Sequence, residues 1–208
     1  MKNDLWIQFG CGLCAPDSWV NYDSSPSLLL QRLPVVGQLV PSGPYGRFPP
    51  NVFFGDIVKG LPIRDGTASL LYCSHVLEHL SLEDLRTALR NCRRVLALGG
   101  IFRLVLPDVE FMVNEYNRDP APEAAIRLME NTILGKKTRP RGIRGFAREW
   151  LGNSQHLWMW DYKSLTLELA NAGFAAARRA EFGDSQITAF NAVESRERWK
   201  DSLGIECK

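Results

Sequence analysis

The chain has 208 residues, a length that fits one domain, with 45% apolar and 23% charged residues, the composition of a globular protein. The net charge of +2 is too small to indicate a nucleic-acid partner by itself. No apolar run approaches the roughly 18 residues of a membrane-spanning helix, and the first residues lack a signal-peptide core, so we expect a cytoplasmic protein without membrane insertion.

The first predicted element is a short apolar strand at residues 5–9, which ends at a Gly-Cys-Gly turn at residues 10–12. Glycine has no Cβ and tolerates positive φ, so backbone N–H groups in such a turn can approach a ligand closely. A second strand-like run, residues 19–22, ends on Asp23, whose carboxylate can accept hydrogen bonds from a ribose diol. Because open α/β sheets bind ligands at the carboxyl ends of their strands, this arrangement predicts a nucleoside site.

The spacing of this stretch is not that of a dinucleotide-binding fold. That fingerprint has a third glycine at the helix start and an acid about 20 residues further on, whereas Cys14 and Ala15 follow here and Asp23 comes early. Only residues 13–18 separate the turn from the next strand. A crossover helix needs about 10–12 residues, so the first helix is expected to be a single turn or absent.

The middle of the chain alternates strands and helices. Ser81 to Asp84 has the form of a capping box, and leucines at three- and four-residue steps continue the helix until Gly99 and Gly100 stop it. The other elements expected in this part are a helical turn at 27–33, a proline-rich loop at 34–50, and strands at 51–57, 68–74 and 101–106.

The last part of the chain carries three more helical patterns and ends in strand-like pieces. The helices are expected at 109–117, 123–134 and 162–173, and the strands at 186–193 and 202–207, the latter closing a sheet edge. Strands that alternate with helices indicate a mostly parallel α/β sheet, and the closely spaced last strands suggest an antiparallel hairpin at one edge.

The ordered set of motifs resembles the class I S-adenosylmethionine-dependent methyltransferases, of the type 11-like kind, over roughly residues 5–110. The matching pieces are residues 7–12, Asp23, Asp56 with Ile57, 61–66, 72–80, 94–100 and 106–108. The resemblance implies a Rossmann-like three-layer sandwich with a seven-stranded sheet. It also implies one domain over residues 1–208, with residues 119–160 inserted on the acceptor side, and S-adenosylmethionine as the cofactor.

The resemblance also implies roles for the first strands. Gly10 and Gly12, with Cys11 between them, would pass under the methionine and ribose of the cofactor, and Asp23 would hold the ribose hydroxyls. Gln8 stands where the family usually has an acid. It can accept a hydrogen bond but brings no charge, so the cofactor affinity could be lower.

Two later sites complete the implied cofactor pocket. Asp56 would accept a hydrogen bond from the adenine amino group, with Ile57 packing on the ring. Ser74 and His75 would line the methionine side, where the methyl group is presented. The sequence does not identify the acceptor. We expect a small molecule or a glycan, since some similar methyltransferases are associated with surface-polysaccharide synthesis, and nucleic acid is a weaker alternative.

A hydroxyl acceptor would need a general base, and His156 and Asp108 are the candidates. His156 lies in the aromatic stretch 155–161, and Asp108 follows the strand at 101–106. A buried structural role for His156 is the alternative. The basic stretch 136–148 could bind an anionic acceptor, or it could be a solvated loop.

Three other functions are weighed against methyl transfer. The first is a non-catalytic binding module on the same fold, suggested by Gln8 and the short first helix. The second is a zinc hydrolase in which His75 and His79 share a metal, although no third ligand is evident and no metal is assigned. The third is a redox pair at Cys11 and Cys14, but five cysteines without a secretion signal indicate reduced packing thiols.

Overall fold

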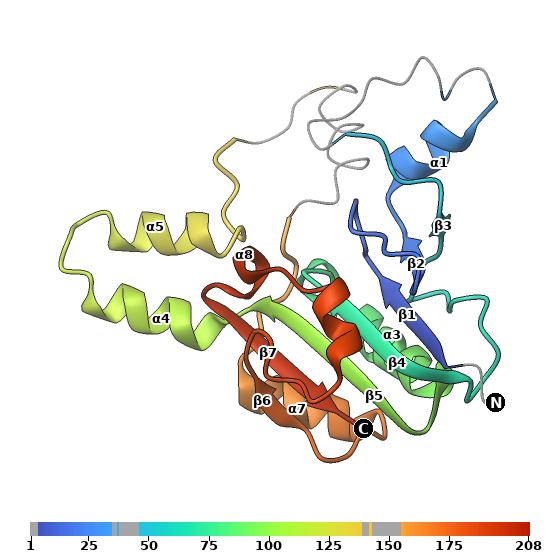
Figure 1. Ribbon diagram of the computed structural model, residues 1–208. Coiled ribbons are helices and arrows are strands. Elements are labelled where there is room, and N and C mark those ends of the chain that lie inside the picture. Colours follow the sequence, from blue (N-terminus) through green and yellow to red (C-terminus); the bar gives the residue numbers. More distant parts are fainter. Residues whose placement is uncertain (1–3, 35–36, 38–45, 139–141, 143–154) are drawn as a thin grey trace.

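Seven strands form one sheet in the order β3-β2-β1-β4-β5-β7-β6 (Figure 1). The structure is a computed structural model and describes residues 4–34, 37, 46–138, 142 and 155–208. The strands β1 to β5 run parallel, and β7 is antiparallel to both of its neighbours, β5 and β6. Their bounds are β1 Leu5–Phe9, β2 Val20–Asp23, β3 Val52–Phe54, β4 Ala68–Ser74, β5 Leu96–Pro107, β6 Arg178–Ala180 and β7 Ser202–Cys207.

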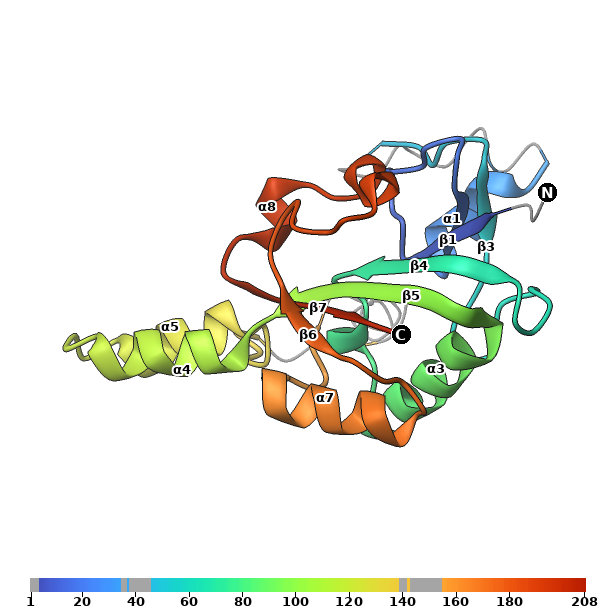
Figure 2. The same ribbon diagram turned by 60° about the horizontal axis from the view of Figure 1, so that its bottom comes forward.

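Two helices, α3 (Leu82–Val95) and α7 (Tyr162–Asn171), cover one face of the sheet (Figure 2). Side chains alternate along a strand, so Leu71 and Cys73 of β4 face this layer and are fully buried in it. The helices present Leu85, Leu89, Leu165 and Leu169 to the same core. Arg86 of α3 and Glu168 of α7 form a two-pronged ion pair with separations of 3.0 and 2.9 Å, which ties the two helices together.

The opposite face is covered mainly by the connection between β6 and β7, which holds the short helices η2 (Thr188–Ala192) and α8 (Arg196–Trp199) (Figure 2). A parallel sheet has to be buried on both faces, and the seven residues between the glycine turn and β2 contain no helix. Phe190 and Trp199 pack instead on Trp19 and Tyr72, in a second core. The segment between β6 and β7 therefore covers the sheet face that has no helix between β1 and β2 to cover it.

A buried arginine fastens this segment to the sheet. Arg103 of β5 is fully buried, and its guanidinium contacts Glu194, Glu206 and Asp184. The same group stacks over the ring of Trp199, with 4.5 Å between Cζ and the ring centroid. Three carboxylates around one guanidinium offset the cost of burying its charge.

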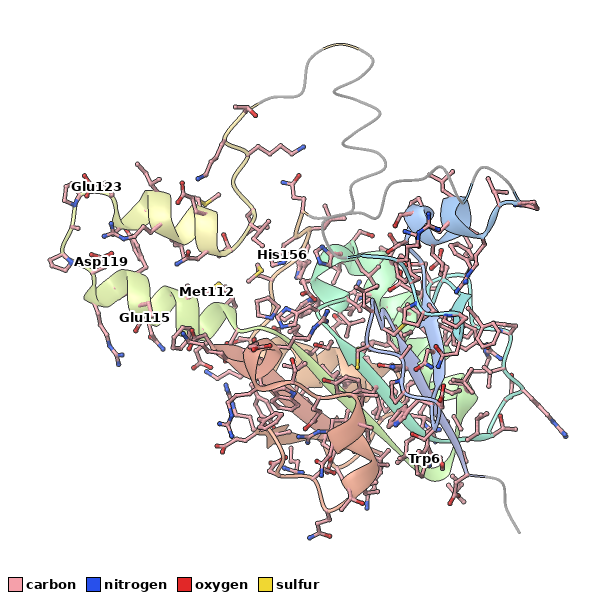
Figure 3. The ribbon with its side chains drawn as sticks, turned by 45° about the horizontal axis from the view of Figure 1, so that its top comes forward. Trp6, Met112, Glu115, Asp119, Glu123 and His156 are labelled. Carbon is pink, nitrogen blue, oxygen red and sulfur yellow. The ribbon has the colours of Figure 1, made fainter. Side chains whose placement is uncertain are left out.

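Between β5 and α7 the chain leaves the body as a helical hairpin of α4 (Val109–Arg118) and α5 (Ala124–Asn131). The hairpin projects away from the sheet in both views (Figures 1 and 2). Figure 3 shows Asp119 and Glu123 at its far tip. Asp119 forms an ion pair with Arg127 across the turn. The predicted insertion at 119–160 therefore begins at this tip and includes α5.

Most of the predicted elements are confirmed. The sheet is mostly parallel and seven-stranded, residues 13–18 hold no helix, and Ser81 caps α3 by accepting a hydrogen bond from the backbone N–H of Asp84 at 3.3 Å. The expected helical turn is α1 (Pro26–Arg32).

Three expectations are wrong. Residues 186–193 contain the 3-10 helix η2 instead of a strand. The strand at 202–207 lies inside the sheet, between β5 and β6, so β6 forms the edge. The helix α3 ends at Val95, and Gly99 and Gly100 belong to β5, because the pairing of β4 with β5 shifts register near its start and absorbs them as an irregularity.

Candidate functional site

The glycine turn after β1 is held by the carboxylate at the end of β2. Asp23 is 5% exposed, and its Oδ2 accepts a hydrogen bond of 2.9 Å from the backbone N–H of Gly12. Its Oδ1 accepts a second one, of 2.8 Å, from the N–H of Ser25. The two predicted residues are therefore in direct contact, and each carboxylate oxygen keeps a further lone pair for another donor.

The two glycines of the turn have different surroundings. Both have positive φ, +64° at Gly10 and +55° at Gly12. A Cβ on Gly10 would lie 2.1 Å from Cγ2 of Val76, so any larger residue there would clash with this side chain. A Cβ on Gly12 would meet only Nη2 of Arg198, at 3.9 Å. The turn is therefore open on the Gly12 side, where a ligand could approach the backbone.

The side chain of Gln8, in β1, links the segment that follows the glycine turn to β2. It is 2% exposed, and its Nε2 donates to the carbonyl oxygen of Cys14 at 2.7 Å and to Oδ1 of Asn21 at 2.6 Å. The side-chain amide nitrogen is thus used within the protein, where it joins the glycine turn to β2. Its position explains why a neutral donor suits this place, since the facing groups are both acceptors.

Asp56 and Ile57 follow β3, at the same carboxyl end of the parallel strands as Gly12 and Asp23. Oδ1 of Asp56 accepts a hydrogen bond of 2.9 Å from the N–H of Val58, and Oδ2 lies 3.4 Å from the Lys59 ammonium. Ile57 is 4% exposed and belongs to the main core. The structure therefore leaves the carboxylate of Asp56 partly free, while the Ile57 side chain is enclosed.

The end of β4 meets the C-terminal segment. His75 has a positive φ of 53°, and its Nε2 lies 2.8 Å from the carbonyl oxygen of Arg198. Nη1 of Arg198 donates to the carbonyl oxygen of Ser74 at 3.0 Å and to its hydroxyl at 3.4 Å. Since Nη2 of the same guanidinium lies beside Gly12, one cation stands between the ends of β1 and β4. No carboxylate of the described residues forms an ion pair with it.

Beyond His75 the chain forms the 3-10 turn η1 (Leu77–His79), which brings Glu78 and His79 to His156. Glu78 is fully buried, and neither of its carboxylate oxygens accepts a hydrogen bond. The rings of His79 and His156 meet edge to face, with 4.9 Å between centroids. His156 lies where the α4–α5 hairpin joins the body (Figure 3).

The histidines of this cluster have opposite pKa shifts. Burial lowers the pKa of His156, although the Glu78 carboxylate opposes that effect. At His75 burial acts in the same direction, but the neighbouring Glu78, 3.2 Å away, and the Arg198 carbonyl outweigh it and raise the pKa. Glu78 therefore raises the pKa of both histidines, and burial outweighs it only at His156.

Asp108, the other predicted base, is occupied elsewhere. It caps α4 by accepting a hydrogen bond from the N–H of Glu110, and its Oδ2 lies 3.2 Å from Nη1 of Arg179. The two predicted catalytic residues therefore have different partners, and only His156 lies in the cluster with Glu78.

The remaining predictions can be placed as well. His75 and His79 do not share one helical face, because His75 is not helical and η1 has three residues. Cys11 is buried and Cys14 exposed, both are free thiols, and burial raises the pKa of Cys11 to about 12, opposite to what a redox pair needs. Most of the basic stretch 136–148 lies outside the described residues.

Sequence reasoning missed Arg198 and Arg103, and it did not connect His156 with Glu78. No local pattern marks either arginine, since each meets its partners only when β6 and β7 fold onto the sheet. A weak signal existed for the histidines: the chain has only three, and two of them stand four residues apart.

A protein-family model described as "Methyltransferase domain" matches residues 35–104. The match begins after the glycine turn, so the turn and Asp23 are supported by the structure and not by this model. No curated protein matches the sequence. Among the described residues, no helix is both long and apolar enough to cross a membrane.

Solved structures share the fold at low sequence identity. A SAM-dependent methyltransferase from Mesorhizobium loti is 16% identical with a TM-score of 0.50, and the match covers 100% of this chain and 92% of that one. A SAM-dependent methyltransferase from Archaeoglobus fulgidus is 14% identical, TM-score 0.50, covering 99% and 86%. PigF, solved with SAH, is 17% identical, TM-score 0.51, with 99% and 50% covered, so this chain spans half of its length.

Proposed function

We propose that the chain is a class I S-adenosylmethionine-dependent methyltransferase, which transfers the methyl group of S-adenosylmethionine to an oxygen or nitrogen nucleophile of a small-molecule or glycan acceptor. The methyltransferase family model that matches residues 35–104 and the shared fold support this proposal. The observation that carries the proposal is the joined arrangement of Asp23, the open side of Gly12, and Arg198 at the ends of three neighbouring strands.

The described residues fit the cofactor in kind. The Asp23 carboxylate has free lone pairs for the ribose hydroxyls, and the open side of Gly12 leaves room beside the backbone for the ribose and the methionine chain. The Arg198 guanidinium, without a carboxylate partner among the described residues, suits the methionine carboxylate. Asp56 is retained as the acceptor for the adenine amino group.

The sulfonium of the cofactor supplies an activated methyl group, so the protein has mainly to align the acceptor with it. We propose that Ser74 and His75, at the end of β4, line the donor end of the pocket, with His156 on the acceptor side. Asp108 is not carried into the proposal, because Arg179 and the start of α4 engage its carboxylate.

The test is thermal unfolding and calorimetric titration with S-adenosylhomocysteine. A ligand at about 100 times its dissociation constant adds roughly 2.7 kcal/mol, which raises the midpoint by about 5–10 °C for a domain of this size. The variant Asp23→Asn keeps the shape of the side chain and is expected to lose most of this shift. Asp65→Asn, which changes an exposed carboxylate paired with Arg94, is the matched control and should behave like the parent.

The same experiment separates the alternatives. If the parent protein shows no shift at millimolar S-adenosylhomocysteine, the proposed cofactor site is wrong. If it binds the cofactor but transfers no methyl group to any member of a broad acceptor panel, the non-catalytic binding module becomes the better account.

A further inference from the structure

We propose that Glu78, His79 and His156 form a binding site for one divalent transition-metal ion. One carboxylate oxygen and one nitrogen of each ring all lie within 4.8 Å of one another. Two imidazoles and one carboxylate are a ligand set that binds zinc and leaves a position open for an oxygen ligand.

The carboxylate of Glu78 is the strongest observation. It is fully buried, and neither oxygen accepts a hydrogen bond, which is costly for a charged group. Nδ1 of His75 lies 3.2 Å from Oε1, and among the described residues no ion pair reaches Oε2. A cation between Glu78 and the two rings would give this carboxylate a ligand bond in place of the missing hydrogen bonds.

Both rings are already oriented as metal ligands are. Nδ1 of His79 lies 3.0 Å from the carbonyl oxygen of Gln155, and Nδ1 of His156 lies 2.8 Å from the carbonyl oxygen of Thr132. A carbonyl oxygen only accepts, so each Nδ1 must carry the proton. The Nε2 atoms are then left with their lone pairs, and that of His156 lies 4.0 Å from Oε1 of Glu78. Such backbone partners fix the ring and the tautomer at metal sites.

The segment that carries His156 is anchored to Glu78 itself. The carbonyl oxygen of Glu78 accepts hydrogen bonds from the N–H groups of Leu157, at 2.7 Å, and Trp158, at 3.2 Å. The backbone therefore places His156 opposite Glu78 although nearly 80 residues separate them in the sequence. All three histidines of the chain meet around this one carboxylate.

The observed spacing needs only a small contraction. A tetrahedral ion with bonds of 2.0–2.2 Å holds its ligand atoms roughly 3.4 Å apart, so no pair of them would have to close by more than about 1.4 Å. Rotation of the Glu78 side chain can supply part of this. The site lies next to His75 at the end of β4. If the proposed function holds, an oxygen of the acceptor could therefore occupy the open position.

The experiment uses cobalt(II) as a spectroscopic substitute for zinc in the full chain, after removal of bound metal with a chelator. We expect one equivalent to bind and to give the visible absorption of a four- or five-coordinate ion. The variants His156→Gln and Glu78→Gln should weaken binding at least tenfold. Asp65→Asn is the control, because it changes an exposed carboxylate that pairs with Arg94 and is not a proposed ligand, and it should bind cobalt like the parent.

Several results would overturn the site. The first is that the parent protein binds no stoichiometric cobalt, a measurement that does not depend on whether any variant folds. His156→Gln could bind as tightly as the parent, or a strong near-ultraviolet thiolate band could show that cysteines bind the ion. The metal test is independent of the cofactor. If the metal-free protein gains stability with S-adenosylhomocysteine but binds no cobalt, only the metal site is refuted. If it binds cobalt but gains no stability with S-adenosylhomocysteine, only the proposed function is refuted.

Discussion

The Nη1 atom of Arg198 donates a hydrogen bond of 3.0 Å to the carbonyl oxygen of Ser74, across 124 residues of sequence. The contact joins the helix α8 to the end of β4, and the other guanidinium nitrogen lies over Gly12. A residue from near the end of the chain therefore stands over the turn formed near its beginning.

Arg198→Gln is predicted to lower the affinity for S-adenosylhomocysteine by about tenfold or more, because a hydrogen-bonded charge on the methionine carboxylate would be lost. Calorimetric titration measures the change. Arg196→Gln, on the same short helix but stacked on Phe182, is the matched control and should leave the affinity unchanged. Equal affinities for both variants would remove Arg198 from the cofactor site.

Gly10→Ala is predicted to destabilise the fold by about 2–4 kcal/mol, since the new methyl group would clash with Val76 and φ would be strained. Denaturant unfolding provides the measurement. The double variant with Val76→Ala removes the clashing atom and should recover part of the loss. No recovery would mean that backbone strain, and not packing, requires glycine at this position.

Glu194→Gln is predicted to cost about 3 kcal/mol of unfolding free energy, because it removes one carboxylate from the fully buried Arg103. Chemical denaturation followed by tryptophan fluorescence reports on Trp199, which the arginine stacks against. Glu181→Gln is the control, since only the backbone carbonyl of Glu181 contacts Arg103. A cost below about 1 kcal/mol would show that Glu206 and Asp184 suffice to hold the arginine.

Alkylation under native conditions is predicted to modify Cys14 alone. It is the exposed thiol among the five, although burial of its sulfur still raises its pKa and will make the reaction slow at neutral pH. Mass spectrometry after timed quenching locates the label. Rapid labelling of Cys11 in the folded protein would contradict its burial and its pKa near 12.

The link between α3 and α7 is predicted to depend on pH. The hydrogen bonds from Arg86 lower the pKa of Glu168 in the folded state. Its contribution, about 0.5–1 kcal/mol for a partly exposed pair, is present above the unfolded value near 4.3 and is lost as the pH falls through the folded pKa. Glu168→Gln should therefore lower the midpoint at pH 7, and its difference from the parent should shrink as the pH falls below the unfolded value. Glu83→Gln, an exposed partner of the same arginine, should change little over the same pH range.

The parts of the fold that follow from the sequence are those whose signal is local. An apolar run, a glycine turn and an acid at the end of the next run fixed the positions of β1, Gly12 and Asp23. The capping serine and the leucine spacing placed the start of α3 correctly, but its end was misplaced because strand pairing with β4 extends β5 back to Leu96.

The parts that could not be predicted are those made by contacts between distant segments. Arg198 reaches Ser74 and His156 reaches Glu78 only after the sheet is complete, and neither pair has a periodic or spaced pattern in the sequence. Residues 186–193 are apolar enough to look like a strand, but Phe190 and Val193 are used to cover a sheet face. Burial of these side chains against the sheet therefore outweighs the strand propensity of the segment.

The cover provided by the segment between β6 and β7 has a consequence for how the protein folds. Trp19 packs on Phe190, with ring centroids 5.7 Å apart, so the second core joins two segments that are far apart in the sequence. The ribosome releases residues 5–23 long before residues 187–199, and until then the apolar side chains on that face have no neighbours. The glycine turn can therefore gain its full surroundings only after residues 187–199 have been synthesised, and until then the uncovered face favours aggregation.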